Sequence, residues 1–233
     1  MSTIRIDATD GSGSFDAHLV EPHDRKPAGA VVVIQEIFGV NEAMRQTCKW
    51  VADMGFIAIC PDLFWRQEPN VDITDKTEAE WQKAFALMNG FNQDKGVEDL
   101  KATLTTVRGH STCNGRAGTL GYCLGGRLAF MMATRSDSDV NVSYYGVGLD
   151  SLLGELGQVR APLLLHIAEL DKFVPPEARA KVLDAVKGRP QIHAWVYPGV
   201  DHAFARPHGV SWNGRAATIA NGRTAEALAA ALG

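Results

Sequence analysis

Apolar and polar positions follow one another in blocks that predict a regular succession of strands and helices. Runs rich in apolar residues, typical of strands buried in a parallel sheet, occur at 30–34, 56–60, 117–120, 140–145, 162–167 and 191–197. Helical patterns separate them, at 41–54, 76–88, 94–108, 127–135, 176–186 and 213–232. Two short strand-like runs, 3–7 and 15–20, flank Asp10-Gly11-Ser12-Gly13 and predict a hairpin.

This order of elements predicts an α/β protein built on a doubly wound, mostly parallel sheet. The N-terminal hairpin is expected at one edge, as its antiparallel part. No Pro/Gly/Ser-rich linker divides the 233 residues, so a single domain over residues 1–233 is expected. In such sheets ligands bind beyond the carboxyl ends of the strands, which directs the search to the loops that follow them.

The loop at residues 121–126 reads Gly-Tyr-Cys-Leu-Gly-Gly and joins a predicted strand to a predicted helix. Strand, G-x-C-x-G, helix is the layout of a nucleophile elbow, which more often carries serine at its centre. Its glycines allow a sharp turn that holds the central side chain above the sheet, near the positive end of the helix. Cys123 is therefore the candidate nucleophile.

An aspartate and a histidine follow two later strands. Asp171 comes after the strand at 162–167, and His202 after the strand at 191–197. The order nucleophile, acid, histidine is that of α/β-hydrolases. A free thiol has a pKa near 8.5, so only a small fraction is ionised at neutral pH, and a histidine oriented by a carboxylate can take up its proton. The pattern predicts a Cys123-His202-Asp171 triad.

Simpler interpretations exist for each of these residues. Cys123 could be a packed core thiol, and His202 a turn histidine. Asp171 could cap the helix that begins near Pro176. The other acids near these loops, Glu169 and Asp201, fit solvated or local capping roles better than catalysis, and His166, inside an apolar strand, fits a core histidine better than a base.

Glu36 stands out because it lies between a fully apolar strand and Ile37-Phe38-Gly39. A buried carboxylate has to be paired, hydrogen-bonded or protonated, and Arg206, four positions after His202, is the candidate partner. A purely structural Glu–Arg pair is the alternative. In this architecture the loop after the third strand and the residue after the nucleophile supply the oxyanion hole, which indicates the backbone N–H groups of Ile37 and Leu124.

Composition and charge limit the kinds of partner and the cellular location that can be expected. With 45% hydrophobic and 21% charged residues, a net charge of −4 and no basic cluster, neither nucleic acid nor an anionic membrane is indicated as a partner. No apolar run has the ~18 residues of a membrane span, and no secretory signal opens the chain, so a cytoplasmic location is expected. No C-x-x-C pair, dinucleotide fingerprint or phosphate loop occurs, and we expect no metal or cofactor.

Taken together, the motifs resemble the dienelactone hydrolases (carboxymethylenebutenolidases). The resemblance covers nearly the whole chain. It rests on the loop at 35–39 (Gln-Glu-Ile-Phe-Gly), Cys60-Pro61-Asp62-Leu63, the segment 121–126, the Asp171 loop, and the stretch from Tyr197-Pro198-Gly199 to His202 and Phe204.

The resemblance implies a monomeric α/β-hydrolase that opens small lactones bearing a carboxylate. It implies Cys123, His202 and Asp171 as the triad and Glu36 as a switch: a substrate carboxylate recruits Arg206, which frees Glu36 to take the thiol proton. Phe38, Tyr144 and Phe173 are then expected to line the pocket, with Arg206, as substrate-binding residues.

The chain departs from the family pattern at two places. The family's second carboxylate-binding arginine lies in the region where this chain has Trp81-Gln82-Lys83, and the serine usual after the histidine is Ala203. A broader carboxylesterase or thioesterase on the same scaffold is the alternative function. A non-catalytic small-molecule binder or a thiol redox sensor is a remoter one; a sensor usually needs a resolving cysteine, and Cys113 is expected before the elbow strand, at the opposite end of the sheet.

Overall fold

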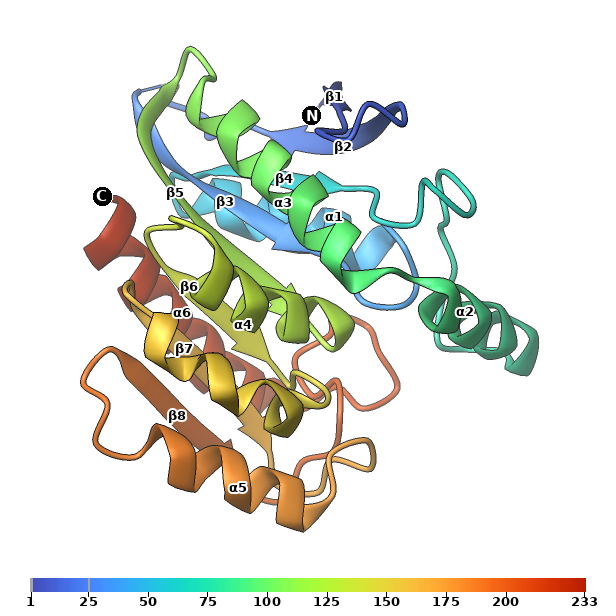
Figure 1. Cartoon of the computed structure of the whole chain (residues 1–233), viewed down its shortest axis with the longest axis vertical. Helices are drawn as coiled ribbons and strands as arrows, with labels where there is room; N and C mark the ends of the chain where they lie inside the picture. The colour runs from blue at the N-terminus through green and yellow to red at the C-terminus, as the bar shows by residue number, and fades with distance from the viewer. Residues whose placement is uncertain (1, 25) are drawn as a thin grey trace.

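The computed structural model of the protein describes residues 2–24 and 26–233, and its central element is an eight-stranded sheet (Figure 1). The strand order is β1-β2-β4-β3-β5-β6-β7-β8, in which β1 and β2 are antiparallel and the other six strands are parallel to one another. The strands are β1 (Ser2–Asp7), β2 (Ser14–Val20), β3 (Ala28–Ile34), β4 (Ile57–Pro61), β5 (Cys113–Tyr122), β6 (Asn141–Tyr144), β7 (Leu163–Ala168) and β8 (Ile192–Tyr197).

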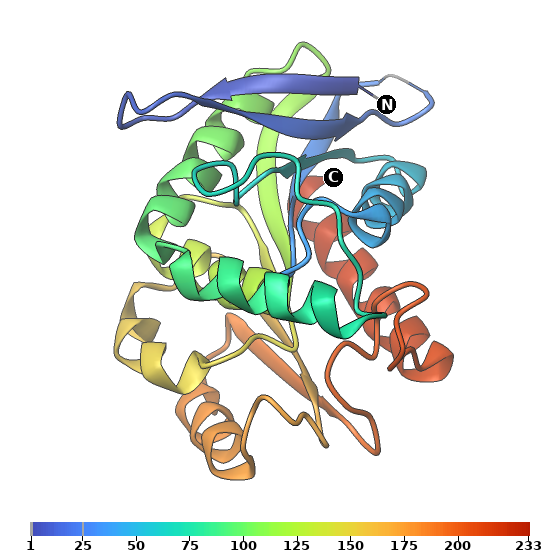
Figure 2. The same ribbon diagram turned by 90° about the vertical axis from the view of Figure 1, so that its right-hand side faces the viewer.

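Helices cover both faces of this sheet, as the edge-on view of Figure 2 shows. One face is covered by α3, α4, α5 and the 3₁₀ helix η1, and the other by α1 and α6. The helices are α1 (Glu42–Asp53), α2 (Glu78–Gly90), α3 (Gln93–Arg108), α4 (Leu124–Arg135), η1 (Leu149–Gln158), α5 (Pro176–Val186) and α6 (Gly214–Leu232). Among the described residues, no helix has the length and apolarity needed to cross a membrane.

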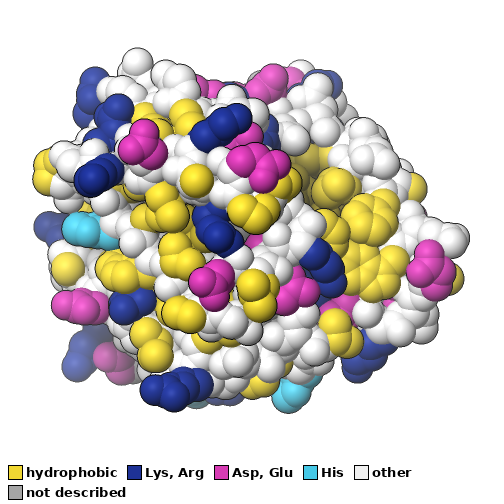
Figure 3. All heavy atoms as spheres, turned by 90° about the horizontal axis from the view of Figure 1, so that it is seen from below, with side chains coloured by type: hydrophobic (Ala, Val, Ile, Leu, Met, Phe, Trp, Pro, Cys, Tyr) yellow, Lys and Arg dark blue, Asp and Glu magenta, His cyan; other side chains and the backbone are white. Residues whose placement is uncertain are grey.

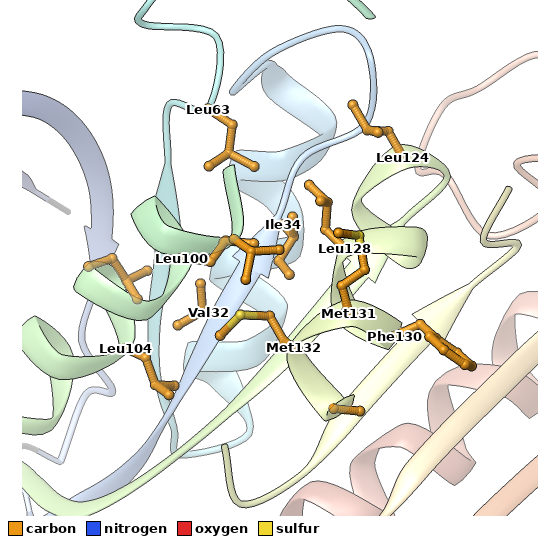
Figure 4. Packing of buried hydrophobic residues seen from close by; sticks show 14 of the residues in the cluster. Val32, Ile34, Leu63, Leu100, Leu104, Leu124, Leu128, Phe130, Met131 and Met132 are labelled. Atoms are coloured by element: carbon orange, nitrogen blue, oxygen red, sulfur yellow. The ribbon is translucent and has the colours of Figure 1, made fainter. Parts of the chain in front are cut away.

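The pleat of β3 explains why its sequence is continuously apolar. Val32 and Ile34 point into the core beneath α3 and α4, whereas Val31 and Val33 point into the core beneath α1 and α6. Side chains of a strand alternate between the two faces, so a strand covered on both faces buries every residue. Figure 4 shows Leu128 and Met132 of α4 beside Val32 and Ile34.

The predicted sheet is confirmed, and most predicted elements appear within one or two residues of their expected bounds. The elbow strand is longer than expected, since β5 begins at Cys113. β4 includes Pro61 as its last residue, although the strand was expected to stop before it. The pattern did not predict η1, because its leucines at 149, 152 and 156 follow spacings of three and four that a loop segment between two strands can also show.

The core position of Leu128 gives a first prediction. Its side chain is fully buried between α4 and the sheet, so Leu128→Ala should lower the free energy of unfolding by about 2–5 kcal/mol through lost burial and a residual cavity. Urea denaturation followed by circular dichroism measures this. The control is Ile219→Ala on α6, where the side chain is 45% exposed and a change within about 0.5 kcal/mol is expected. Similar losses for both variants would contradict this account of the core.

Candidate active site

The turn between β5 and α4 places Cys123 at the carboxyl edge of the sheet. Cys123 has φ +56° and ψ −114°, a conformation that residues other than glycine seldom adopt. The glycines around it are required by close backbone packing: a Cβ on Gly121 would lie 1.9 Å from the carbonyl oxygen of Gly125, and one on Gly125 would lie 2.3 Å from that of Ile34. The expected elbow geometry is therefore present, and Cys123 is buried at its tip.

The structure brings His202 and Asp171 together from the loops after β8 and β7. The Nδ1 of His202 lies 2.8 Å from Oδ2 and 3.0 Å from Oδ1 of Asp171, and both side chains are almost fully buried. Asp171 also accepts a hydrogen bond from the backbone N–H of Phe173, at 2.9 Å. The carboxylate thus fixes the ring and assigns the Nδ1 proton, leaving Nε2 on the other side.

The competing acids have local roles. Glu169 accepts a hydrogen bond from the backbone N–H of Gly199, and Asp201 accepts bonds from the backbone N–H groups of Lys172 and His202. The residue before α5 is Pro175, and no side chain caps that helix, so Asp171 is not its cap. Of the three candidates, only Asp171 contacts the histidine ring.

The pKa of His202 is raised to about 10. Burial alone would lower it, but the charge of an ionised Cys123 and the hydrogen-bonded Asp171 carboxylate outweigh that effect. The Nε2 atom is buried and forms no well-aligned hydrogen bond within the part of the chain that the structure describes. The histidine is thus held ready to carry a proton next to the sulfur.

A cavity of about 190 Å³ opens onto Cys123 and His202. Its wall is mostly apolar and aromatic; besides Cys123 and His202 it is formed by Ile37, Phe38, Trp81, Phe85, Met88, Val147, Phe173 and Arg206. Phe173 packs edge-on against the His202 ring, with 4.8 Å between centroids. Figure 3 shows hydrophobic side chains gathered on its right-hand side, the side on which α2 lies in Figure 1.

Glu36 and Arg206 form the buried pair that the sequence indicated. The Nε and Nη2 atoms of Arg206 donate to the two carboxylate oxygens of Glu36, at 2.5 and 2.9 Å. Arg206 has a second partner that was not predicted, because its Nη1 donates to Asp75 at 2.5 Å. Burial would lower the pKa of Arg206, but the charge of Glu36 outweighs it and raises the pKa, so the guanidinium stays charged.

In the described chain, the Glu36 carboxylate has hydrogen bonds with Arg206 only, and the thiol is not among its partners. The predicted contact between the resting thiol and Glu36 therefore stays a prediction. The loop that carries Glu36 is firmly held: the side chain of Gln35 accepts from the backbone N–H of Leu63 at 3.0 Å, and Gly39, at φ +76°, fits under the backbone of Val71 with no space for a Cβ.

Ile37 and Leu124, the predicted oxyanion-hole residues, both lie near Cys123. Ile37 is part of the cavity wall beside Cys123. Leu124 is the first residue of α4, so its backbone N–H has no acceptor within the helix and is free to point towards a ligand. Their assignment as oxyanion donors stays a prediction.

Tyr144 is not brought to the cavity, contrary to expectation. Its hydroxyl donates to Asn221 at 2.9 Å and lies 2.7 Å from the Thr224 hydroxyl, both on α6. Tyr145, the residue directly after β6, has a positive φ of +39°, and its ring instead lies beside the site, with its centroid 5.0 Å from that of His202. His166 is a core histidine: both ring nitrogens are bonded, and burial, with the charge of Arg223, lowers its pKa to about 3.

Sequence reasoning missed most of the wall that α2 provides. Trp81, Phe85 and Met88 recur at helical spacing, a signal that an apolar face exists but not that it faces a ligand cavity rather than the core. Asp75 carried no signal, since it is one polar residue in a segment without periodicity. In the part of the chain that the structure describes, no three His, Cys, Asp or Glu side chains are grouped so as to hold a metal ion.

The environment of His202 gives a second prediction. The largest cause that raises its pKa is the charge of Cys123, so Cys123→Ala should lower the His202 pKa from about 10. NMR titration of the imidazole nitrogens measures it in both proteins. The control is Cys113→Ala, at the far end of β5, which should leave the titration unchanged. An unaltered His202 pKa in Cys123→Ala would show that the sulfur does not act on the ring.

Comparison with known proteins places this geometry in a family. The family model described as "Dienelactone hydrolase family" matches residues 15–232. A protein of Azospirillum brasilense, provisionally named a carboxymethylenebutenolidase, is 57% identical, over 97% of this chain and 96% of its own. A carboxymethylenebutenolidase of Pseudomonas putida is 38% identical, over 93% of each chain.

Solved structures share the fold. A protein of Klebsiella pneumoniae, provisionally named a dienelactone hydrolase, has a TM-score of 0.82 at 24% identity, with 98% of this chain and 99% of that chain covered. A dienelactone hydrolase of Anabaena variabilis has a TM-score of 0.71 at 17% identity, covering 100% and 99%. Because the family model and the relatives span nearly the whole chain, this α/β-hydrolase belongs to the dienelactone hydrolase family.

Proposed function

We propose that the protein hydrolyses small lactones that bear a carboxylate, by a Cys123-His202-Asp171 triad and a covalent acyl-thioenzyme. The observation that carries the proposal is the buried Asp171–His202 pair beside a strained cysteine at the tip of the elbow. A packed structural thiol needs neither a positive φ nor a histidine held by a carboxylate. The relatives' names add the substrate class, since two of them name carboxymethylenebutenolidases.

In the first half of the reaction the Cys123 sulfur attacks the lactone carbonyl. A carbon–sulfur bond forms, and the carbonyl electron pair moves to the oxygen, where the backbone N–H groups of Ile37 and Leu124 stabilise the negative charge. When the intermediate collapses, the ring carbon–oxygen bond breaks. The leaving oxygen takes the proton that His202 received from the thiol, and an open-chain thioester remains.

In the second half of the reaction His202 has to act as a base. Formation of the thioester itself prepares this, because it removes the charge that raises the His202 pKa. The charge of Cys123 is the largest cause that raises the pKa, and it disappears when the sulfur becomes a thioester. Burial then acts with less opposition and favours the neutral ring. Neutral His202 takes a proton from water, whose oxygen attacks the thioester. The carbon–sulfur bond breaks, and the sulfur leaves as thiolate beside the imidazolium.

Arg206 is the group that would meet a substrate carboxylate. Among the described residues it is the only Lys or Arg side chain in the cavity wall. Its Nε and Nη2 atoms bind Glu36 side by side, in a geometry that also suits a substrate carboxylate. A carboxylate on this fork would displace Glu36, which is then free to receive the thiol proton and pass it on to His202.

A broader carboxylesterase or thioesterase is the second candidate. The observation that favours it is the wall of Trp81, Phe85 and Met88, which offers an acyl or aryl group apolar contact and no charge. Both candidate functions use the same triad. They differ only in whether the substrate carries a carboxylate that binds Arg206.

We also propose that the protein acts in the cytoplasm, as a monomer, and without a metal or cofactor. The first is supported by the four cysteines, which are all free thiols and show no dependence on an oxidising compartment.

The nucleophile gives a third prediction. Cys123→Ala should lower kcat/KM for a dienelactone and for 4-nitrophenyl acetate by at least about 10⁴-fold, because no other group can form the thioester. Spectrophotometric assay measures both, and mass spectrometry of the wild type mixed with slow substrate should show an acyl adduct on Cys123. The control is Cys113→Ala, which should keep full activity. Retained turnover in Cys123→Ala would overturn the proposed function.

Arg206 gives a fourth prediction. Arg206→Ala should lower kcat/KM for a carboxylated lactone about 10–100-fold more than for a neutral aryl ester, because a charge-assisted fork to the substrate is lost. Arg206→Lys keeps the charge but not the fork, and should shift the same ratio in the same direction. Arg206→Ala leaves two buried carboxylates without a cation, which can destabilise the fold, whereas Arg206→Lys keeps a positive charge beside them. Equal losses on both substrates in both variants would show that Arg206 is structural.

A further inference from the structure

Three charged side chains form one buried cluster, which reaches the cavity wall through Arg206. Arg206 lies between Glu36 and Asp75, and the three side chains are 6%, 1% and 4% exposed. Two carboxylates and one guanidinium leave one negative charge in excess. Charges with so little water around them interact strongly, so this excess acts on any ion that enters.

The two carboxylates use different parts of the guanidinium. Glu36 accepts from Nε and Nη2, and Asp75 accepts from Nη1, so a ligand that replaces Glu36 on its edge need not disturb Asp75. The guanidinium also lies over the Phe38 ring, with its Cζ 4.9 Å from the ring centroid, which limits its movement towards the ligand.

Asp75 is held independently of Arg206. Its carboxylate also accepts from the backbone N–H of Val210 at 3.3 Å, and its backbone carbonyl accepts from the indole N–H of Trp81 at 3.0 Å. Trp81 is itself part of the cavity wall and packs edge-on against Phe38, 5.0 Å between centroids. Asp75 is therefore a fixed part of the site, whereas Glu36 is the carboxylate on the edge that a ligand would take.

We propose that Asp75 is a specificity-determining residue that weakens the hold of Arg206 on a substrate carboxylate. It does so as a permanent anion on the same guanidinium, and the inference rests on the proposed function. An incoming carboxylate meets Arg206 with its charge already offset and has to lie near a like charge that cannot leave. Hydrolysis of a carboxylated lactone produces a second carboxylate, so the same repulsion favours release of the product.

The test compares two substrates in the Asp75→Asn variant. Asparagine has nearly the same shape and keeps an acceptor oxygen for Arg206, but carries no charge. The ratio of kcat/KM for a carboxylated dienelactone to that for 4-nitrophenyl acetate should rise about tenfold, mainly through a lower KM for the dienelactone. Benzoate, as competitive inhibitor of the ester reaction, should bind about tenfold more tightly.

The matched control is Asp72→Asn, which removes the same charge three positions earlier, where the carboxylate pairs with Arg45 at 2.8 Å and not with Arg206. It should leave the ratio and benzoate inhibition unchanged. An unchanged or lower ratio in Asp75→Asn, or an equal rise in the control, would overturn the proposal. The proposed function fails separately, through activity that survives in Cys123→Ala.

If Asp75→Asn has no turnover, a binding measurement replaces the kinetic test. Calorimetric titration of benzoate into Cys123→Ala and into Cys123→Ala/Asp75→Asn compares the two charge states without catalysis. Tighter binding to the second protein supports the role of Asp75. Equal or weaker binding overturns it, and so does failure of that protein to fold, because a residue that only holds the fold together would give this result.

Discussion

The whole site depends on one close backbone contact, the crossing of β5 and α4 at the elbow. The Gly121 Cα faces the carbonyl oxygen of Gly125 so closely that no side chain fits between them, and Gly125 in turn packs on the end of β3 at Ile34. This crossing forces Cys123 into its strained conformation and brings the loop after β3 next to it. Cys123 and the Glu36 loop are therefore positioned by the same contact.

The second constraint is electrostatic. Burying Glu36, Asp75 and Arg206 together costs desolvation energy that ion pairing offsets only when every group is well bonded. An apolar replacement of the three would often be no less stable, so stability alone does not account for such a cluster. Its position does, because Arg206 lies in the wall of the cavity that contains the sulfur. The cluster therefore presents one charged side chain, Arg206, to a mostly apolar pocket.

The fold could be predicted almost completely from sequence because its signals are local. A strand covered on both faces must be apolar throughout, as in 30–34, and helices such as that at 176–186 begin at a proline and show their own period. The meeting of the proposed triad residues was predictable for a related reason: each lies in the loop that follows a strand, and the topology of the sheet collects those loops at one edge.

The rest of the site could not be predicted because it depends on how distant segments meet. Asp75 precedes α2 and meets Arg206 over a separation of 131 positions, with no pattern that links them. Tyr144 and Tyr145 illustrate a finer limit. Both are aromatic and they are adjacent, but Tyr144 ends β6 and bonds to α6, whereas Tyr145 lies beyond the strand, with a positive φ, and its ring packs beside His202. The hydrophobic pattern carries no information on such a change of backbone direction.

These constraints converge on α2. The helix contributes the apolar wall through Trp81, Phe85 and Met88, and the segment just before it contributes Asp75, whose carbonyl is bonded to the Trp81 indole. The shape of the pocket and the charge beneath it therefore come from one segment of chain. A change that moves the start of α2 alters both, which, under the proposed function, ties the apolar fit of a substrate to the strength with which Arg206 holds its carboxylate.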